Sequence, residues 1–569
     1  MEYKKFIIEN YKAIKHIEIP LSNSVIPLIG VNESGKTTIL NAILAFDSSK
    51  DSLMNGKHIN PKNKYKTSQE QCRIIAEIVI NKDEFEIIGK YAKLNMDSEL
   101  YIWLKEKADR KESICIERVF EKNKITKDYR IINTDIDDEK IDKVTKGILK
   151  YSPNILYFDD FSDRVPEKIP FPKEFAEDGK YSRGSIREWQ EIIAEIFNRA
   201  LEGNMPLKEF MELEDEDDKM NYLNDVEQIL NRMIIKEWDE LKNVLSSEVD
   251  GDLALRLNCN ETDGEFEFTF KIHDREKGDK NRVFNIGERS KGFQWFFNFN
   301  MKLKFNPKYE THPDNAIYLL DEPGSYLHSS AQTELLKKLC EIANNNTIIY
   351  CTHSQYLLDP DIINIGNIRI IEKEEGDIKI EEYGTSKTNK ATGAFSALND
   401  ALQLKFGMKD NSLKNVILTE GIIDYYFINM FLNLPDITII PGSGAGHLKE
   451  LISIMIGCSE NYLVILDNDS AGRNARKEYK DYFKKSFEDH CYQYEGIGDK
   501  AEKFELEDLL GKEYGEEIKR EMNNSNIKRA LTELYFSDDE TKGKIIELMP
   551  EEISKRIKIF ERKILENFN

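Results

Sequence analysis

The stretch VIPLIGVNESGKTTIL, residues 25–40, decides how the first part of this chain should fold. Its apolar start predicts a buried strand, and its end has the pattern of a helix. Between them, Gly30, Gly35, Lys36 and Thr37 complete the pattern G-x-x-x-x-G-K-S/T. In this order of strand, loop and helix, backbone N–H groups surround phosphate oxygens. The sequence therefore predicts an α/β domain with a phosphate-binding loop, and the flanking elements disfavour a simple glycine turn.

The residue types in this loop divide the binding of a nucleotide between them. Lys36 is expected to reach the β and γ phosphate oxygens, and Thr37 is expected to offer its hydroxyl to Mg²⁺. Asn32 in the loop and Thr38 in the first turn of the helix are predicted to complete the nucleotide contacts. ATP and Mg²⁺ are therefore the cofactors that we expect for this domain.

Two later apolar strands carry the residues that would complete the nucleotide site. AIYLLDEPGSYLH, residues 316–328, runs a strand into Asp321 and Glu322. Asp321 would hold Mg²⁺ through water, and Glu322 would orient or deprotonate the attacking water. TIIYCTHS, residues 347–354, is a further buried strand that ends in His353. A lone histidine at a strand end is more often structural, but its place soon after the DEP sequence favours a sensor of the γ-phosphate.

The order of these motifs resembles that of ABC-type ATPases of the structural-maintenance and recombination-repair branch. The segment ERSKGFQWFF matches the signature segment of that branch loosely at Ser290, Gly292 and Gln294, and basic residues replace its neutral neighbours. The resemblance implies that this segment of one subunit caps the ATP held by another, and so implies a homodimer or higher oligomer. Gln69 and Gln71 are candidates for the glutamine loop, although a surface role explains them better.

Carboxylates gather in the last third of the chain, where YLVILDNDSAGR, residues 462–473, ends an apolar strand. In an extended backbone Asp467 and Asp469 face the same way, so their charges repel unless a cation lies between them. A hard metal ion fits this geometry, although a solvated turn would explain the DND tripeptide alone. Two earlier units of strand and helix begin at NVILTEG and ITIIPGSGAG. Three such units predict a small parallel sheet with functional groups at its C-terminal edge, where Glu420 also lies.

Glu-Gly after one strand and D-x-D after the third resemble the TOPRIM fold of topoisomerases, bacterial primases and certain nucleases. The resemblance implies phosphodiester chemistry with Mg²⁺ or Mn²⁺ bound by Glu420, Asp467 and Asp469. Asp424, in the helix that follows Glu420, would support this set. These four carboxylates are the predicted catalytic residues of the C-terminal domain.

Charged residues further along the chain extend this prediction. EKFELEDLL, residues 502–510, could supply Glu505 for catalysis and Glu507 for a second metal, although a charged helix face explains the segment equally well. Lys542 and Lys544 could donate to the scissile phosphate, on the strength of position alone. A basic run after the D-x-D pair would guide a nucleic-acid backbone, with a solvated helix face as the alternative. The run consists of Arg473, Arg476, Lys477, Lys480, Lys484 and Lys485.

An ABC-type ATPase joined to a TOPRIM domain resembles the OLD (overcoming lysogenization defect) family of nucleases, including the Gabija nuclease subunit and retron-associated effectors. The resemblance covers about 1–165 and 250–520. It implies an ATP-regulated, Mg²⁺-dependent DNA endonuclease of antiphage defence. The implied partners are DNA, a second copy of the chain, and a helicase or a reverse transcriptase with its nucleic acid.

Three alternatives stay open beside this reading. A TOPRIM ribonuclease acting on tRNA or other RNA would use the same carboxylates. A recombination-repair ATPase without nuclease activity would lack an intact acid set, and the complete set of Glu420, Asp467 and Asp469 argues against it. A topoisomerase-like strand transferase would need a nucleophilic tyrosine, and none of the 25 tyrosines stands out.

The composition of the 569 residues fits a multidomain protein of the cytoplasm that does not enter a membrane. No apolar run approaches a membrane span, the N-terminus lacks the apolar core of a signal peptide, and the seven scattered cysteines show no CxxC spacing. The net charge of -23 disfavours a protein that coats nucleic acid non-specifically. Any DNA should therefore bind locally.

The fold class predicted for the whole chain is α/β, with an ABC-type ATPase domain followed by a Rossmann-like TOPRIM domain. Acidic residues with Leu, Ile and Met at helical spacing predict a helical insertion within the ATPase domain. The predicted boundaries are 1–165 for the first half of the ATPase domain, 166–250 for a helical insertion that could mediate dimerisation, 251–385 for the second half, 386–411 for a linker, 412–520 for the TOPRIM domain and 521–569 for a C-terminal helical extension.

Overall fold

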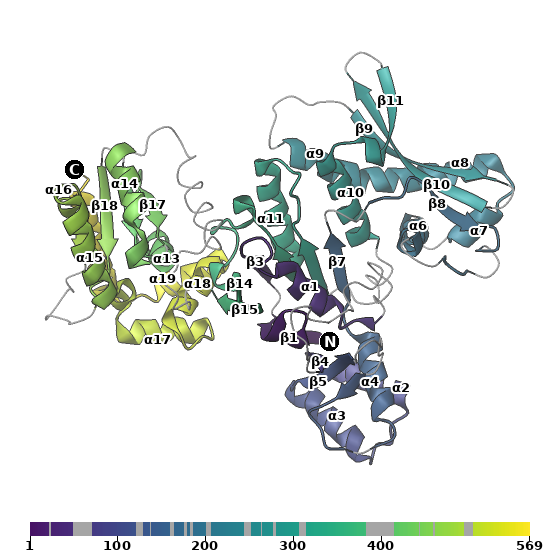
Figure 1. Cartoon of the computed structure of the whole chain (residues 1–569), viewed down its shortest axis with the longest axis horizontal. Helices are drawn as coiled ribbons and strands as arrows, with labels where there is room; N and C mark the ends of the chain where they lie inside the picture. The colour runs from purple at the N-terminus through teal and green to yellow at the C-terminus, as the bar shows by residue number, and fades with distance from the viewer. Residues whose placement is uncertain are drawn as a thin grey trace. The chain divides into compact units, whose positions relative to one another are not determined.

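The computed structural model of the chain forms two compact units (Figure 1). Unit 1 comprises residues 1–357 and 367–394, and unit 2 comprises residues 358–366 and 395–569. The structure describes residues 1–568 apart from 22–23, 49–70, 121–128, 137, 160–163, 176–178, 183–185, 201–205, 244–251, 263–264, 277–279, 306–314, 383–414, 443, 459–460 and 494–503. The predicted linker, 386–411, and Gln69 lie outside the described residues. Within them, no helix is both long and apolar enough to cross a membrane.

A parallel sheet forms the centre of unit 1. β3 (Val25–Ile29) and β13 (Thr347–Cys351) are buried along their whole length, as expected for strands that are covered on both faces. β12 (Ile317–Asp321) pairs in parallel with β13 on one side and with β7 (Ile155–Asp159) on the other. Because β13 also pairs in parallel with β3, the C-terminal ends of these strands meet at one edge. The helices that follow β3 and β12 are α1 (Lys36–Leu44) and α11 (Ser329–Ala343).

An antiparallel part extends this sheet to eleven strands in the order β6-β5-β4-β1-β2-β15-β14-β3-β13-β12-β7. The further strands are β1 (Glu2–Tyr11), β2 (Ile14–Pro20), β4 (Cys72–Val79), β5 (Ile114–Phe120), β6 (Tyr129–Ile131), β14 (Arg369–Glu374) and β15 (Asp377–Glu382). Phe6 and Ile8 of β1 share one hydrophobic core with Ile39 and Ile43 of α1. The additional helices of this part are α2 (Lys82–Ala92), α3 (Glu99–Arg110) and α4 (Ile141–Tyr151). The mixed sheet confirms the α/β class predicted for this half of the chain.

Residues 169–304 of unit 1 form a lobe of helices on a second, antiparallel sheet. Its helices are α6 (Ile186–Ala200), α7 (Leu207–Glu212), α8 (Glu216–Leu230), the π-helical η3 (Asn231–Ile235), α9 (Lys236–Asn243), the short η4 (Ile286–Glu288) and α10 (Lys291–Lys304). Its strands are β8 (Ile169–Pro172), β9 (Asp252–Glu261), β10 (Glu265–Glu276) and β11 (Lys280–Asn285), and β10 pairs with each of the other three.

The strand β8 is a difference from the helical insertion that the sequence predicts for 166–250. Its four residues, IPFP, pair with β10 and place Ile169 and Phe171 in the core. Two prolines in so short a segment are compatible only with the edge of a sheet, and they leave no periodic pattern from which a strand could be predicted.

Unit 2 contains a parallel sheet in the order β17-β16-β18-β19. The strands are β16 (Asn415–Thr419), β17 (Thr438–Pro441), β18 (Asn461–Leu466) and β19 (Cys491–Gln493). All three strand pairs are parallel, which confirms the predicted small parallel sheet. Since the chain order reverses about β16, the C-terminal ends of β16 and β18 form a topological switch point, where ligands bind in sheets of this kind.

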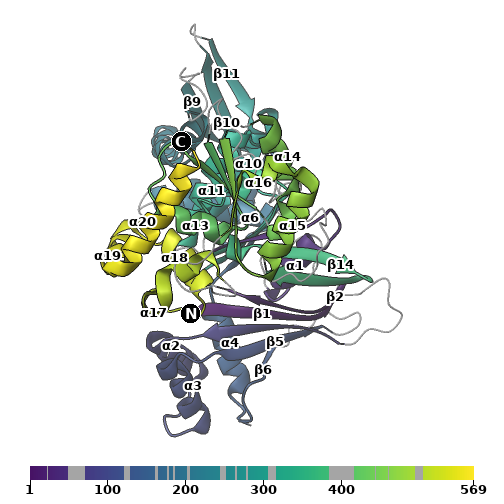
Figure 2. The same cartoon turned by 90° about the vertical axis from the view of Figure 1, so that its left-hand side faces the viewer.

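Helices cover both faces of this sheet. Figure 2 shows α13 on one face and α14 and α15 on the other, as right-handed crossovers between these strands require. The helices of unit 2 are α13 (Ile422–Phe431), α14 (Lys449–Cys458), α15 (Ser470–Phe483), α16 (Lys485–Glu488), the short η8 (Leu506–Leu510), α17 (Gly511–Glu521), α18 (Ile527–Phe536), α19 (Asp539–Glu547) and α20 (Glu551–Glu566). Within the predicted extension, 521–569, the described residues form α18, α19 and α20 joined by short turns.

Candidate nucleotide and carboxylate sites

Two glycines let the loop after β3 follow a tight path. Gly35 has a φ of 110°, and a Cβ there would lie 2.2 Å from Cδ1 of Ile378. A Cβ at Gly30 would lie 2.4 Å from the carbonyl oxygen of Ile371. The loop therefore packs directly on the hairpin of β14 and β15, in a conformation that only glycine adopts at low cost. The buried hydroxyl of Ser34 in this loop has no partner among the described residues, which leaves a polar atom for a ligand.

Lys36, at the start of α1, is buried with its ammonium against this loop. Nζ donates to the carbonyl oxygens of Gly30 at 2.9 Å and Val31 at 3.3 Å, and it lies 2.9 Å from Nε2 of His353. Burial lowers the pKa of Lys36. Burial and the Lys36 ammonium lower the pKa of His353, so a neutral ring accepts this hydrogen bond at pH 7. A phosphate in this loop would meet both a cation and a neutral imidazole.

The C-terminal end of β12 supplies two carboxylates with different partners. Oδ1 of Asp321 accepts a hydrogen bond from the Thr37 hydroxyl at 3.1 Å, so these two oxygens are close enough to share one Mg²⁺ ion. Glu322 has a φ of 52°, a strained value for a residue with a side chain. One carboxylate oxygen of Glu322 accepts from the backbone N–H of His353 at 3.3 Å, and the other lies 3.5 Å from its Nε2. The donors of these three strand ends together fit Mg²⁺-ATP.

The remaining predicted nucleotide contacts lie in two places. Asn32 is exposed in the loop, and Thr38 is half-buried in the first turn of α1. Ser290 caps α10, because its Oγ accepts a hydrogen bond from a backbone N–H of that helix at 3.3 Å. Gly292 packs so closely that a Cβ would lie 3.2 Å from the carbonyl oxygen of Tyr326. The structure thus brings Asn32 and Thr38 to the phosphate loop, and it places Ser290 and Gly292 at the start of α10.

A second set of carboxylates lies at the switch point of unit 2. Oε1 of Glu420, after β16, accepts a hydrogen bond from the backbone N–H of Asp467, after β18, at 2.7 Å. Asp469 caps α15 by accepting from the N–H of Gly472 at 2.7 Å, and a Cβ at Gly472 would lie 2.7 Å from the Glu420 carboxylate. Asp424 accepts from the N–H of residue 421 at 2.9 Å in the first turn of α13. The glycine leaves room for the acids to approach one another.

These carboxylates lie close together at positions that are half-buried, or buried in the case of Asp424. Burial, followed by the charges of Asp467 and Asp469, raises the pKa of Glu420 to about 8. Burial and the charges of Asp424 and Glu507 raise the pKa of Asp467 to about 8. Burial is also the main cause that raises the pKa of Asp424 to about 7. Mutual repulsion of this kind identifies a place where a cation would be stabilising.

Lys528, in the first turn of α18, is the cation that the fold itself brings to these acids. Nζ lies 2.9 Å from Glu505 and 3.0 Å from Glu507. Burial opposes its charge, but the two glutamates raise the pKa of Lys528 above its usual range. Glu505 and Glu507 thus lie beside these acids, and their predicted roles in catalysis and in binding a second metal stay predictions. The sequence reasoning missed Lys528, since nothing local distinguishes it, and chose Lys542, which the structure places on α19 beside an apolar cavity.

The carboxylates of unit 2 already have hydrogen bonds or ion pairs with other groups of the protein. Backbone N–H groups bind Glu420, Asp424 and Asp469, and Lys528 binds the pair on η8. Over the parts of the chain that the structure describes, no three His, Cys, Asp or Glu side chains have the arrangement of a formed metal site. The donor set consists of oxygen ligands only, which suits a hard cation such as Mg²⁺ or Mn²⁺.

The predicted basic run lies on α15 and α16, which follow β18. Arg473 donates to the side-chain oxygen of Asn468 at 3.0 Å, and Lys480 pairs with Glu488 at 2.5 Å. Part of the positive charge on this surface is therefore already matched by protein groups.

One curated protein is similar to part of this chain. A curated relative from Methanocaldococcus jannaschii, the uncharacterized protein MJECL43, is 27% identical over 146 residues, which is 25% of this chain and 34% of that protein. This chain thus spans about a third of the length of that relative.

Solved SMC head domains align with the chain at low similarity. A head bound to the C-terminal winged helix domain of ScpA gives a TM-score of 0.36 at 16% identity, over 67% of this chain and 98% of that one. The SMC head domain from Thermotoga maritima gives 0.32 at 13% identity, over 67% and 99%. At these TM-scores, nothing further is inferred from the likeness.

A family model supplies the decisive comparison for unit 1. The model described as AAA ATPase domain matches residues 1–177 and 180–358. These ranges contain the phosphate loop, both carboxylates at the end of β12, and His353. The match covers more than half of the chain, which therefore belongs to the AAA ATPase domain family.

Proposed function

We propose that this ATPase is an ATP-regulated, metal-dependent endonuclease that hydrolyses DNA phosphodiesters, with unit 2 as a TOPRIM domain of the OLD family type. The observation that carries the proposal is the approach of Glu420 and Asp467, 2.7 Å apart from carboxylate to backbone, at the topological switch point of a parallel sheet. A structural role alone does not account for five carboxylates that interact with one lysine, Lys528. They are Glu420, Asp424, Asp467, Glu505 and Glu507.

The residues of unit 1 would divide ATP hydrolysis between them. Lys36, Thr37 and Asp321 would hold Mg²⁺-ATP. Glu322 would accept a hydrogen bond from the attacking water and orient it towards the γ-phosphate, because its strained backbone directs the carboxylate to the strand ends. His353, beside both Lys36 and Glu322, would report the presence of the γ-phosphate to the residues that follow it.

The residues of unit 2 would prepare a phosphodiester for hydrolysis. Glu420, Asp467 and Asp469 would hold Mg²⁺ or Mn²⁺, which supplies an activated water and stabilises the charge of the leaving oxygen. Lys528 would donate to a phosphate oxygen, and this gives it the role that the sequence analysis assigned to Lys542. Asp424 would keep the helix that carries it in place through its capping hydrogen bond.

The proposal includes an assembly and a biological setting. Ser290 is exposed at the N-terminus of α10, and Gly292 is buried in the first turn of that helix. From there Ser290 could reach the nucleotide of a second copy, so we expect at least a homodimer. DNA would bind beside the basic run of α15. A role in antiphage defence with a helicase or reverse transcriptase partner rests on the sequence resemblance alone.

The experiment that tests the proposal is cleavage of supercoiled plasmid and of a matched RNA by the purified chain. Each substrate is incubated with MgCl₂, MnCl₂ or EDTA, with and without ATP. We expect nicked or linear plasmid with Mg²⁺ or Mn²⁺, none with EDTA, and none with Asp467→Ala. Asp481→Ala, which removes an exposed carboxylate from α15, is the matched control and should cleave normally.

Each result of this assay decides between the alternatives. Cleavage of RNA but not plasmid would replace the DNA endonuclease by a ribonuclease that uses the same carboxylates. ATP hydrolysis without cleavage of either substrate would leave an ATPase of the recombination-repair type. Equal cleavage by Asp467→Ala and wild type would refute the carboxylate site.

A further inference from the structure

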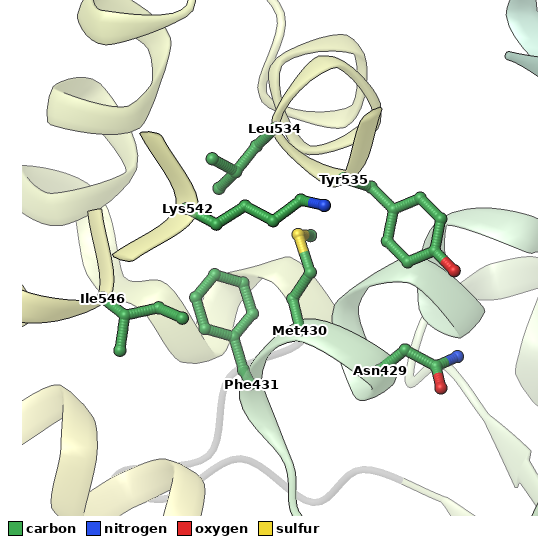
Figure 3. A pocket seen from close by; sticks show the side chains of 7 residues that line it. All are labelled: Asn429, Met430, Phe431, Leu534, Tyr535, Lys542 and Ile546. Atoms are coloured by element: carbon green, nitrogen blue, oxygen red, sulfur yellow. The ribbon is translucent and has the colours of Figure 1, made fainter. Parts of the chain in front are cut away.

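A cavity of about 190 Å³ opens between the last turns of α13 and α18 and the helix α19 (Figure 3). Met430 and Phe431 of α13, Leu534 of α18 and Ile546 of α19 give it an apolar wall. Ile546 remains 46% exposed, so apolar surface is left open to solvent at the mouth. The cavity exceeds the share of several water molecules, about 30 Å³ each, and is smaller than a pocket for a drug-sized ligand. It therefore fits a small organic group.

Lys542 gives this apolar cavity a single positive charge. Figure 3 shows its stem running across the cavity between Leu534 and Met430, with Nζ directed towards Tyr535. Nζ lies 5.7 Å from the centre of the Tyr535 ring, a cation–π contact that leaves its N–H donors free to bind an anion. Within the described residues, no carboxylate is close enough to Lys542 to form an ion pair, whereas Lys544 on the same helix pairs with Glu521 at 2.8 Å.

We propose that this cavity is a binding site for a small carboxylate with an apolar aryl or alkyl body. The carboxylate accepts hydrogen bonds from the Lys542 ammonium, and the body displaces water from Met430, Phe431 and Ile546. An apolar ligand without charge would leave the Lys542 ammonium without an anionic partner. A small inorganic anion would leave the apolar side chains of the cavity in contact with water. Only a molecule with both parts satisfies the whole cavity.

The position of the cavity suggests that its ligand regulates unit 2. α13 carries Asp424 in its first turn and Met430 in its last, and α18 carries Lys528 in its first turn and Leu534 in its last. The two helices pack together through the stacked rings of Tyr426 and Tyr535, whose centres are 4.3 Å apart. A group wedged between their C-terminal ends would alter the spacing of their N-terminal ends. This regulatory effect rests on the proposed nuclease function, whereas the binding itself does not.

Ligand binding is measured by NMR on the full chain with ¹³C-methyl methionine, using 3-phenylpropanoate as the probe. The Met430 methyl resonance, assigned from Met430→Leu, should shift with a dissociation constant in the millimolar range, as expected for about eleven heavy atoms. Lys542→Gln should weaken binding at least about fivefold, because it removes the charged hydrogen-bond donor and keeps most of the stem. The uncharged 3-phenylpropan-1-ol should bind wild type and Lys542→Gln equally.

Two controls make the outcome decisive. Lys544→Gln removes a charge from the same helix outside the cavity and should bind the probe like wild type. Ile546→Glu places a negative charge at the mouth and should abolish binding while leaving the melting temperature within a few degrees of wild type. The proposal is overturned if Met430 does not shift with either probe, or if Lys542→Gln binds 3-phenylpropanoate as tightly as wild type. If the purified chain binds the probe but cleaves neither plasmid nor RNA, only the regulatory effect is refuted.

Discussion

Glu420→Gln should make unit 2 more stable at alkaline pH and should remove its response to divalent ions. The folded pKa of Glu420, about 8, lies above the ordinary value of a glutamate. Its stabilising contribution is therefore fully present below about pH 4.5 and is lost as the pH rises through 8, because folding then requires a buried carboxylate to ionise beside other acids. Glutamine has no such proton to lose, and its side-chain oxygen can still accept the N–H of Asp467.

The size of the effect follows from the same pKa. A change from about 4.5 to about 8 corresponds to an upper limit of about 5 kcal/mol above pH 8. Glu420 is only half-buried and solvent screens part of the repulsion, so we expect about 2 kcal/mol. For a unit of this size, that free energy raises the melting temperature by about 4–8 °C at pH 8.5. At pH 5 the difference between the two proteins should nearly vanish.

Calorimetry in EDTA at pH 5 and pH 8.5 measures this difference. Glu547→Gln, which neutralises an exposed carboxylate at the end of α19, is the control and should melt like wild type at both values. Addition of MnCl₂ at pH 8.5 should raise the melting temperature of wild type, because the cation offsets the crowded charges, and should leave Glu420→Gln almost unchanged. A Glu420→Gln protein that is less stable than wild type at pH 8.5 would show that the ionised carboxylate is already compensated, and the crowding argument would be wrong.

Four further changes test separate parts of the molecule. Glu322→Gln should slow ATP hydrolysis at least about 100-fold with ATP affinity retained, since water loses its orienting group; unchanged turnover would exclude that role. Lys528→Met should lower plasmid cleavage about 100-fold while Mn²⁺ still raises the melting temperature, whereas an unaffected rate would make Lys528 structural. If Ser290 completes the ATP site of a second copy, the specific ATPase rate of wild type should rise with protein concentration, and Ser290→Arg should abolish that rate. A wild-type rate that does not depend on concentration would refute this contact between copies. Tyr425→Phe removes the hydrogen bond from the Tyr425 hydroxyl to Asp361, which ties residues 358–366 to α13. It should reduce the effect of ATP on cleavage about fivefold with ATP hydrolysis intact, and an undiminished effect would refute coupling through this bond.

The residues of each site that lie close to the end of a strand in the sequence could be predicted. Asp321 ends β12, His353 follows β13 closely, and Lys36 begins the helix after the loop that follows β3. Parallel strands deliver their C-terminal ends to one edge whatever the rest of the fold does. The same rule placed Glu420 and Asp467 together from their separate strands. Where a function depends on residues adjacent to buried strands, local patterns are therefore sufficient.

The residues that the sequence could not supply depend on how helices pack. Lys528 reaches the acids because α18 packs on α13 near η8, a contact between segments far apart in the chain. No periodic or motif signal marks that helix position, so Lys542, another lysine in the same extension, was an equally reasonable choice. The strand β8 was missed for a related reason, because its pairing with β10 comes from tertiary context and its two prolines conceal it.

The chain itself supplies a route by which the nucleotide site could influence the carboxylate site. Residues 358–366 belong to unit 2 but begin only five residues after His353. Inside unit 2, Asp361 accepts a hydrogen bond from the Tyr425 hydroxyl of α13 at 2.8 Å and from the Tyr535 hydroxyl of α18 at 3.4 Å. These helices begin with the turns that hold Asp424 and Lys528. A shift of the strand end at His353 between nucleotide states thus has a short covalent path to both helices. Such a path transmits a signal only if ATP binds two arrangements unequally, and for that reason the hydrogen bond from Tyr425 to Asp361 is the contact to test.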